Sequence, residues 1–144
     1  MAGTVPEFEI VVRGGHPDFL DLPWDTPLAE WDHERVVPMA HGISRHVVRF
    51  VRYDRRAYAV KETAEEAAEA EHRALRALRD GRLPVVEPIG LVRSRPAGGT
   101  ARLITRYLDF SLPYWYVIGR EAPTPTDVLL DAAVVLLVRL HLAG

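Results

Sequence analysis

Short apolar runs bounded by turn residues predict β-strands along much of this 144-residue chain. Many of the apolar residues are Val, Ile, Phe or Tyr, which favour a pleated and half-buried backbone. Glycine, proline and aspartate separate the runs and mark turns between strands. The predicted strands cover residues 8–12, 36–39, 47–53, 56–61 and 101–108.

One segment, residues 63–80, has the pattern of an amphipathic helix. Thr63 and Glu66 have the spacing of a capping box, and Gly81 follows the last helical residue. The apolar positions repeat at helical spacing and form a stripe of Ala64, Ala67, Ala68, Ala74, Leu75 and Leu78.

Glu71 falls in the middle of this apolar stripe when roughly 100° is counted per residue. A carboxylate that faces a core costs free energy unless a cation meets it there. The nearest candidate in sequence is Lys61, on the strand that precedes the helix. We therefore expect a Lys61–Glu71 pair; the alternative is that Glu71 lies at the edge of the stripe and reaches water.

Lys61 is the only lysine in a chain that contains seventeen arginines. An ammonium group is a compact charge on a flexible stem, and a planar guanidinium does not replace it at a tight phosphate site. This contrast makes Lys61 a candidate phosphate ligand. The alternative is that an arginine-rich composition left one lysine by chance.

Residues 1–35 are predicted to form an appendage that precedes the main folded unit. The segment contains one predicted strand, a turn at residues 14–17 and a short helix near residues 27–31. Trp24, Leu28 and Trp31 are expected to attach the appendage by apolar packing rather than to form a binding cage. Near the other end, Thr124 and Asp127 are expected to cap a last helix, with Pro125 at its first position.

Several motifs together resemble those of protein kinases. Tyr58-Ala59-Val60-Lys61 resembles the Val-Ala-Ile-Lys strand, and Glu71 resembles the glutamate of the helix that follows it. Residues 83–92 resemble the fourth strand and its approach in small-molecule kinases, and Leu140-His141-Leu142-Ala143-Gly144 resembles the Leu-His-x-x-Gly that ends the first large-lobe helix. Residues 36–144 as a whole resemble an uncharacterised bacterial family that is similar to lipopolysaccharide kinases of the Kdo and heptose type.

The resemblance implies an α+β fold. It implies a protein-kinase-like N-terminal lobe, with a five-stranded antiparallel sheet and one helix, followed by the start of a helical large lobe. The corresponding divisions are the appendage at 1–35, the small lobe at 36–108, and the hinge exit with the first large-lobe helices, incomplete, at 109–144.

The resemblance also implies a nucleotide site. Lys61, oriented by Glu71, would hold the α- and β-phosphates of ATP, and Ala59 with either Val47 or Val48 would contact the adenine. Backbone groups of Arg106 and Leu108 would bond the adenine edge. Gly42 and Ser44 would approach a phosphate from the turn at residues 41–46, where ordinary hairpin chemistry is the alternative.

The expected function is that of the ATP-binding portion of a kinase-like phosphotransferase. The catalytic aspartate and the magnesium ligands of kinases would follow Gly144, so no catalytic residue is assigned within these residues and Mg²⁺ is expected only in the complete protein. The phosphoryl acceptor is unknown. One alternative is a pseudokinase-like binding or regulatory module without phosphoryl transfer, and another is that Lys61 and Glu71 only satisfy each other.

Composition and charge limit the kinds of binding partner and the cellular location that the sequence predicts. A net charge of −2 argues against a dedicated nucleic-acid binder, and the six histidines lack the spacing of a metal site. The basic hairpin, with arginines at 45, 49, 52, 55 and 56, is a possible site for a protein partner or simply a solvated face. No signal peptide is expected, because residues 1–7 lack a basic start and a long apolar core. No transmembrane segment is expected, because the apolar run 128–138 contains Asp131 and is shorter than the ~20 residues of a spanning helix. We expect a cytoplasmic protein.

Overall fold

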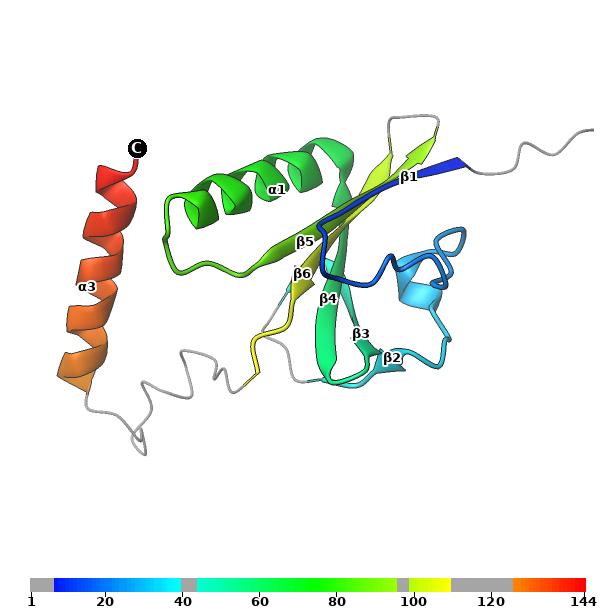
Figure 1. The fold of residues 1–144 in the computed structure, drawn as a ribbon, viewed down its shortest axis with the longest axis horizontal. Helices are drawn as coiled ribbons and strands as arrows, with labels where there is room; N and C mark the ends of the chain where they lie inside the picture. Colours follow the sequence, from blue (N-terminus) through cyan, green and yellow to red (C-terminus); the bar gives the residue numbers. More distant parts are fainter. Residues whose placement is uncertain (1–6, 40–43, 96–98, 110–125) are drawn as a thin grey trace, which may run out of the picture.

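A single antiparallel sheet organises the chain (Figure 1). The computed structural model describes residues 7–39, 44–95, 99–109 and 126–144, and within them the sheet has six strands in the order β1-β5-β6-β4-β3-β2. The strands are β1 (Glu7–Val12), β2 (Val36–Val37), β3 (Val47–Tyr53), β4 (Arg56–Ala64), β5 (Pro88–Arg95) and β6 (Thr100–Arg106).

The expectation of a five-stranded kinase-like lobe is wrong, because β1 adds a sixth strand to the sheet. β1 comes from the segment predicted to be an appendage, and it pairs with β5 from Glu7↔Arg95 to Val12↔Gly90. The pairing satisfies backbone groups that would otherwise line an open edge of β5. Gly90 allows the close approach, since a Cβ there would lie 2.6 Å from the carbonyl oxygen of Val11.

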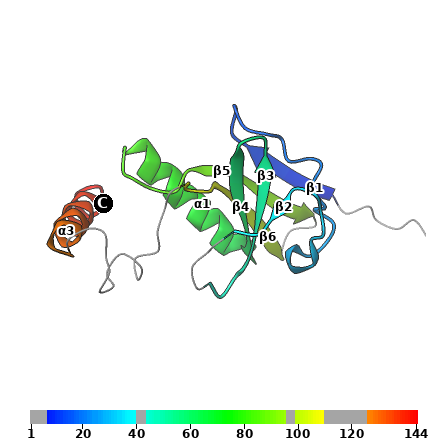
Figure 2. The same cartoon turned by 90° about the horizontal axis from the view of Figure 1, so that it is seen from below.

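Two α-helices accompany the sheet in the described residues, so the α+β class holds, but no kinase-like helical lobe is present among them. α1 (Glu65–Asp80) lies along one face over β4, β5 and β6. α3 (Thr126–Leu142) lies beside the C-terminal end of α1 in both views (Figures 1 and 2), where Arg139 donates a 2.8 Å hydrogen bond to the carbonyl of Arg82. Neither of these helices is long and apolar enough to span a membrane.

The ends of α1 differ from the sequence prediction. The helix begins at Glu65, and its N-cap residue, Ala64, makes no side-chain capping bond, so the predicted capping box of Thr63 and Glu66 is wrong. Thr63 is instead paired with Ala101 as part of β4. The cap predicted for the last helix at Thr124 and Pro125 lies outside the described residues.

Residues 13–35 cover the face of the sheet opposite α1. Phe19, Leu22, Trp24, Leu28 and Trp31 are buried against sheet residues such as Val51, Tyr58, Val60, Val92 and Ile104. A short 3₁₀ helix, η1 (Leu28–Glu30), lies within this segment, which we call the covering segment. The predicted packing role of Trp24, Leu28 and Trp31 is therefore confirmed.

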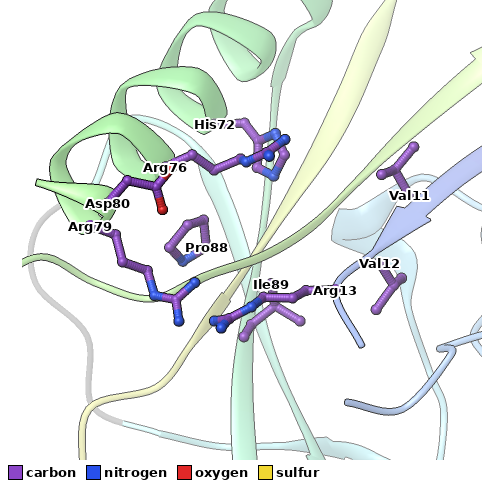
Figure 3. A pocket seen from close by; sticks show the side chains of 9 residues that line it. All are labelled: Val11, Val12, Arg13, His72, Arg76, Arg79, Asp80, Pro88 and Ile89. Carbon is purple, nitrogen blue, oxygen red and sulfur yellow. The ribbon is translucent and has the colours of Figure 1, made fainter. Parts of the chain in front are cut away.

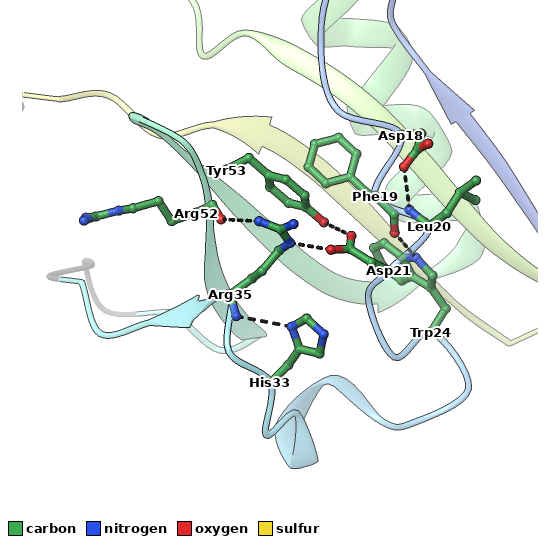
Figure 4. Close-up of polar contacts among 9 residues, drawn as sticks. All are labelled: Asp18, Phe19, Leu20, Asp21, Trp24, His33, Arg35, Arg52 and Tyr53. Atoms are coloured by element: carbon green, nitrogen blue, oxygen red, sulfur yellow. Dashed lines mark hydrogen bonds and ion pairs between the residues drawn. The ribbon is translucent and has the colours of Figure 1, made fainter.

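Polar contacts fix the covering segment to β3 (Figure 4). The Asp21 carboxylate accepts hydrogen bonds from Arg35 and from the hydroxyl of Tyr53, and the Arg35 guanidinium lies 3.9 Å from the centre of the Tyr53 ring. Burial raises the pKa of Asp21, but the Tyr53 and Arg35 hydrogen bonds outweigh that effect and lower its pKa overall. Burial, together with the bond to Asp21, raises the pKa of Tyr53.

Arg102 connects β6 to the covering segment through the interior. Its side chain is 7% exposed, and its Nε donates a 2.7 Å hydrogen bond to Glu62 on β4. The two terminal nitrogens reach the carbonyl oxygens of Trp24 at 3.0 Å and Thr26 at 3.4 Å. The buried charge is thus paired and hydrogen-bonded, which is the condition under which a core tolerates it.

Candidate functional site

The structure brings Lys61 and Glu71 together. Lys61 lies near the C-terminal end of β4, and α1 begins directly after that strand. Glu71 therefore faces back toward the sheet from the second turn of α1, and its Oε2 accepts a hydrogen bond from the Lys61 Nζ. The two side chains are 24% and 40% exposed, so the pair is held in place yet open to solvent.

Strand register decides which neighbours share the face of Lys61. Val48 on β3 and Leu103 on β6 are the direct partners of Lys61, and directly paired residues point to the same side of a sheet. Ala59, two residues before Lys61, lies on this face as well. Val47 lies on the opposite face and packs against the core under the covering segment. Of the two valines that the sequence left open, Val48 is the one beside Lys61.

An aromatic pair that the sequence analysis missed lies next to Ala59. Phe50 is the direct β3 partner of Ala59, and its ring meets the ring of Tyr107 edge to face with centroids 5.4 Å apart. The sequence contained a signal for Phe50, because a residue two positions after Val48 on the same strand points to the same face of the sheet. Only the register shows that both residues belong to the Lys61 face. Together with Ala59 they provide apolar surface of the kind that receives a planar base.

At the end of β6, where adenine was expected to bond, backbone amides already donate hydrogen bonds within the protein. The Arg106 amide donates a 3.0 Å hydrogen bond to the carbonyl of Glu87, and the Tyr107 amide donates one of 3.0 Å to the carbonyl of Ala57. Arg106 therefore has no amide hydrogen left for an adenine edge, and only its carbonyl fits that part of the expected role. Leu108 follows with a half-exposed side chain.

The turn before β3 gives little support for phosphate binding. Gly42 lies outside the described residues. Ser44 is exposed, and its hydroxyl accepts a 3.1 Å hydrogen bond from the amide of His46. That contact is the local turn chemistry typical of serine.

The arginines of the basic hairpin do not form one surface. Arg49 points to the covering segment, where it donates a 2.6 Å hydrogen bond to the carbonyl of Ala29. Arg52 points to the opposite face of β3, which is the face that carries Lys61. Arg55 and Arg56, at the β3–β4 turn, are exposed and border a cavity of about 700 Å³ with His16 and Tyr53.

His16 is enclosed beside this cavity. Its Nδ1 lies 3.3 Å from the Tyr58 hydroxyl, and its Nε2 lies 3.8 Å from the Glu87 carboxylate. Burial lowers the pKa of His16; the Glu87 charge opposes that shift, and the charges of Arg13, Arg56 and Arg106 add to it. In the described residues, no group of three or more His, Cys, Asp or Glu side chains is arranged to hold a metal ion.

Comparison of the sequence with protein-family models and curated proteins, and of the fold with solved structures, yields no significant match.

Proposed function

We propose that this chain is the nucleotide-binding part of a phosphotransferase similar to lipopolysaccharide kinases, with ATP as its nucleotide. The observation that carries the proposal is the contact between the only lysine, Lys61, and Glu71 on a partly exposed face of the sheet. Such an enzyme would act in the cytoplasm on an acceptor that the described residues do not identify.

The side chains on this face have distinct roles in the proposal. Glu71 holds the Lys61 ammonium group in position by accepting a hydrogen bond from its Nζ. Lys61 then presents N–H donors to the phosphate oxygens. Val48 and Ala59, with the Phe50 and Tyr107 rings beside them, would receive the base on the same face.

The residues present fit ATP in part. The ammonium group and the apolar surface suit its phosphates and its base, whereas Arg106 offers the base edge a carbonyl but no amide hydrogen. ATP would supply the phosphoryl group, and the contribution of this chain is to bind and orient the nucleotide.

The test compares nucleotides that differ only in their phosphates. Titration calorimetry with ADP and with adenosine would be run on the unchanged protein and on Lys61→Met. Loss of a charge-assisted hydrogen bond should weaken ADP binding about tenfold to a hundredfold. Adenosine, which carries no phosphate, should bind both proteins equally. Lys61→Arg should also weaken ADP binding, since a planar guanidinium does not reproduce the ammonium geometry.

Two substitutions in α1 provide the matched comparison. Glu71→Gln should lower ADP affinity, because it removes the charge that orients Lys61, whereas Glu66→Gln, at an exposed position of the same helix, should not. If the unchanged protein bound no ADP, Lys61 and Glu71 would be only a structural pair. If Lys61→Met bound ADP as tightly as the unchanged protein, the phosphate role of Lys61 would be wrong.

The second candidate is a binding or regulatory module that transfers no phosphoryl group. The exposed Arg55 and Arg56 beside the cavity at the β3–β4 turn favour it, because they offer guanidinium groups to an acidic partner. Nucleotide binding without any transfer of labelled phosphate in the complete protein would favour this candidate over the first.

A further inference from the structure

A second concave site lies beside α1 (Figure 3), next to β1 and β5 rather than β4, the strand that carries Lys61. The cavity measures about 440 Å³ and opens between the C-terminal half of α1 and the paired strands β1 and β5. On the strand side the lining residues are Val11, Val12, Pro88 and Ile89, but the side chains of Val12 and Ile89 turn into the core under the covering segment, so the apolar wall is formed by the side chains of Val11 and Pro88. The α1 side carries the side chains of His72, Arg76, Arg79 and Asp80, and Arg13 reaches the cavity from the end of β1 (Figure 3). We call this the arginine cavity.

Arginines outnumber carboxylates around the arginine cavity, whose lining, within the described residues, contains Arg13, Arg76 and Arg79 but only one carboxylate, that of Asp80. Glu87 pairs with Arg13 at 2.6 Å, with Arg79 at 3.8 Å and with Arg106 at 3.6 Å, so three guanidinium groups share one carboxylate. The Arg79 contact is longer than a hydrogen bond. Arg79 thus keeps donors for another acceptor while its side chain points into the cavity toward Arg13 (Figure 3).

Arg76 adds a charge that nothing in the described parts of the chain neutralises through an ion pair. It projects from α1 one turn after His72 (Figure 3). Burial lowers the pKa of His72, and the positive charges of Arg76 and Arg93 lower it further. The guanidinium group of Arg76 thus lies at the cavity beside an imidazole whose protonation it opposes.

We propose that the arginine cavity binds a phosphate monoester that carries a compact apolar substituent. Arg76 and Arg79 would hold the phosphate oxygens, since a guanidinium fork matches phosphate geometry. The side chains of Val11 and Pro88 would receive the substituent. The volume of the cavity exceeds the needs of inorganic phosphate, and the apolar wall explains why an ester fits better than the free ion.

The experiment uses inorganic phosphate and phenyl phosphate as probes in a chloride-free buffer at about pH 7.5, where both are largely dianions. Binding would be followed by calorimetry and by the ¹H–¹⁵N signals of the His72 ring. We expect both probes to shift the His72 signals, and phenyl phosphate to bind at least several-fold more tightly because it buries apolar surface.

Arg76→Gln and Arg73→Gln form a matched pair on the same helix, both at exposed positions and with the same change of charge. Arg76→Gln should weaken both probes about tenfold, as expected for one lost charge-assisted contact, and Arg73→Gln should leave them nearly unchanged. Equal effects of the two substitutions would mean diffuse attraction and would overturn the proposal, as would the absence of binding. Equal affinity for the two probes would overturn the role of the apolar wall.

Discussion

Arg82 ends α1 in a backbone conformation that L-residues avoid. Its φ is +58°, whereas Gly81, which the sequence suggested as the terminating residue, has a φ of −75°. The Arg82 amide bonds to the Arg79 carbonyl at 2.8 Å, and the Leu83 amide bonds to the Leu78 carbonyl at 3.0 Å. This pair of bonds closes a helix by a left-handed residue, a position that glycine usually occupies. The left-handed conformation therefore destabilises the native state at Arg82, because the glycine that would tolerate it stands one residue earlier, at Gly81.

Arg82→Gly is expected to stabilise the protein. Removing Cβ relieves left-handed strain, partly offset by the greater entropy of glycine in the unfolded chain, for a net gain of roughly 0.5–1 kcal/mol. The bond from Arg139 is retained because its acceptor is the backbone carbonyl. Urea denaturation would measure the free energy of unfolding.

Gly81→Ala is the natural companion measurement. A Cβ at Gly81 would meet its nearest neighbours at 3.4 Å, an ordinary contact, so alanine fits without strain. A destabilised Arg82→Gly variant beside a tolerated Gly81→Ala variant would show that the left-handed residue at position 82 is not under strain.

At the scale of elements, the pattern of apolar and polar residues predicted where individual strands lie better than it predicted which strands pair. β3 has the predicted bounds, and β1 and β4 differ from the prediction by one and three residues. β5 begins only at Pro88, because the residues from Leu83 onward follow the turn that closes α1 rather than the sheet. The place of β1 beside β5 could not be predicted, since the pairing joins segments about eighty residues apart and local pattern carries no information on it.

Arg102 connects β6 to the covering segment, and we expect its replacement to weaken the packing of the covering segment on the sheet. Arg102→Met leaves the Glu62 carboxylate without its cation and the carbonyls of Trp24 and Thr26 without a donor. Breaking a buried pair in this way costs about 3–5 kcal/mol. The free energy of unfolding would fall accordingly, and tryptophan fluorescence would report the altered environment of the packed Trp24 and Trp31 rings.

The double variant Arg102→Met with Glu62→Met separates charge from packing. Replacing both partners by apolar side chains removes the unpaired charge, so it should recover much of the stability that Arg102→Met loses. If the double variant were less stable than Arg102→Met, the ion pair could not be the source of the loss.

For the whole molecule, the candidate site divides into parts that the sequence could and could not predict. Lys61 and Glu71 were predictable because a single lysine and a carboxylate on an apolar stripe are local signals. The choice of Val48 over Val47, and the Phe50–Tyr107 ring pair, depended on register across β3 and β4. The arginine cavity was not foreseen, since it combines β1, α1 and β5.

Stability should fall in two steps as the whole protein is acidified. The pKa values of His16 and His72 are lowered, chiefly by burial, so the unfolded chain takes up protons before the native state does. Stability is therefore lost as pH falls from about 6.5 toward the native pKa values of the two histidines. The pKa of Asp21 is lowered as well, so its contribution persists above its unfolded value and disappears at still lower pH.

Thermal unfolding at about pH 7.5 and about pH 5 would measure the first step, in the range where histidines titrate. His72→Gln should make the melting temperature less sensitive to pH over this interval. His46→Gln, at an exposed turn position, serves as its control. An unaltered pH dependence in His72→Gln would show that His72 does not contribute to the first step.

The isolation of Lys61 among seventeen arginines makes it a unique chemical handle. Apart from the α-amino group, an acylating reagent meets one amine in the entire polypeptide, and that amine is partly exposed and bound to Glu71. Mass spectrometry of a single modified peptide would then report occupancy of this face directly. A ligand that contacts the ammonium would slow the labelling, and one that binds elsewhere would leave its rate unchanged.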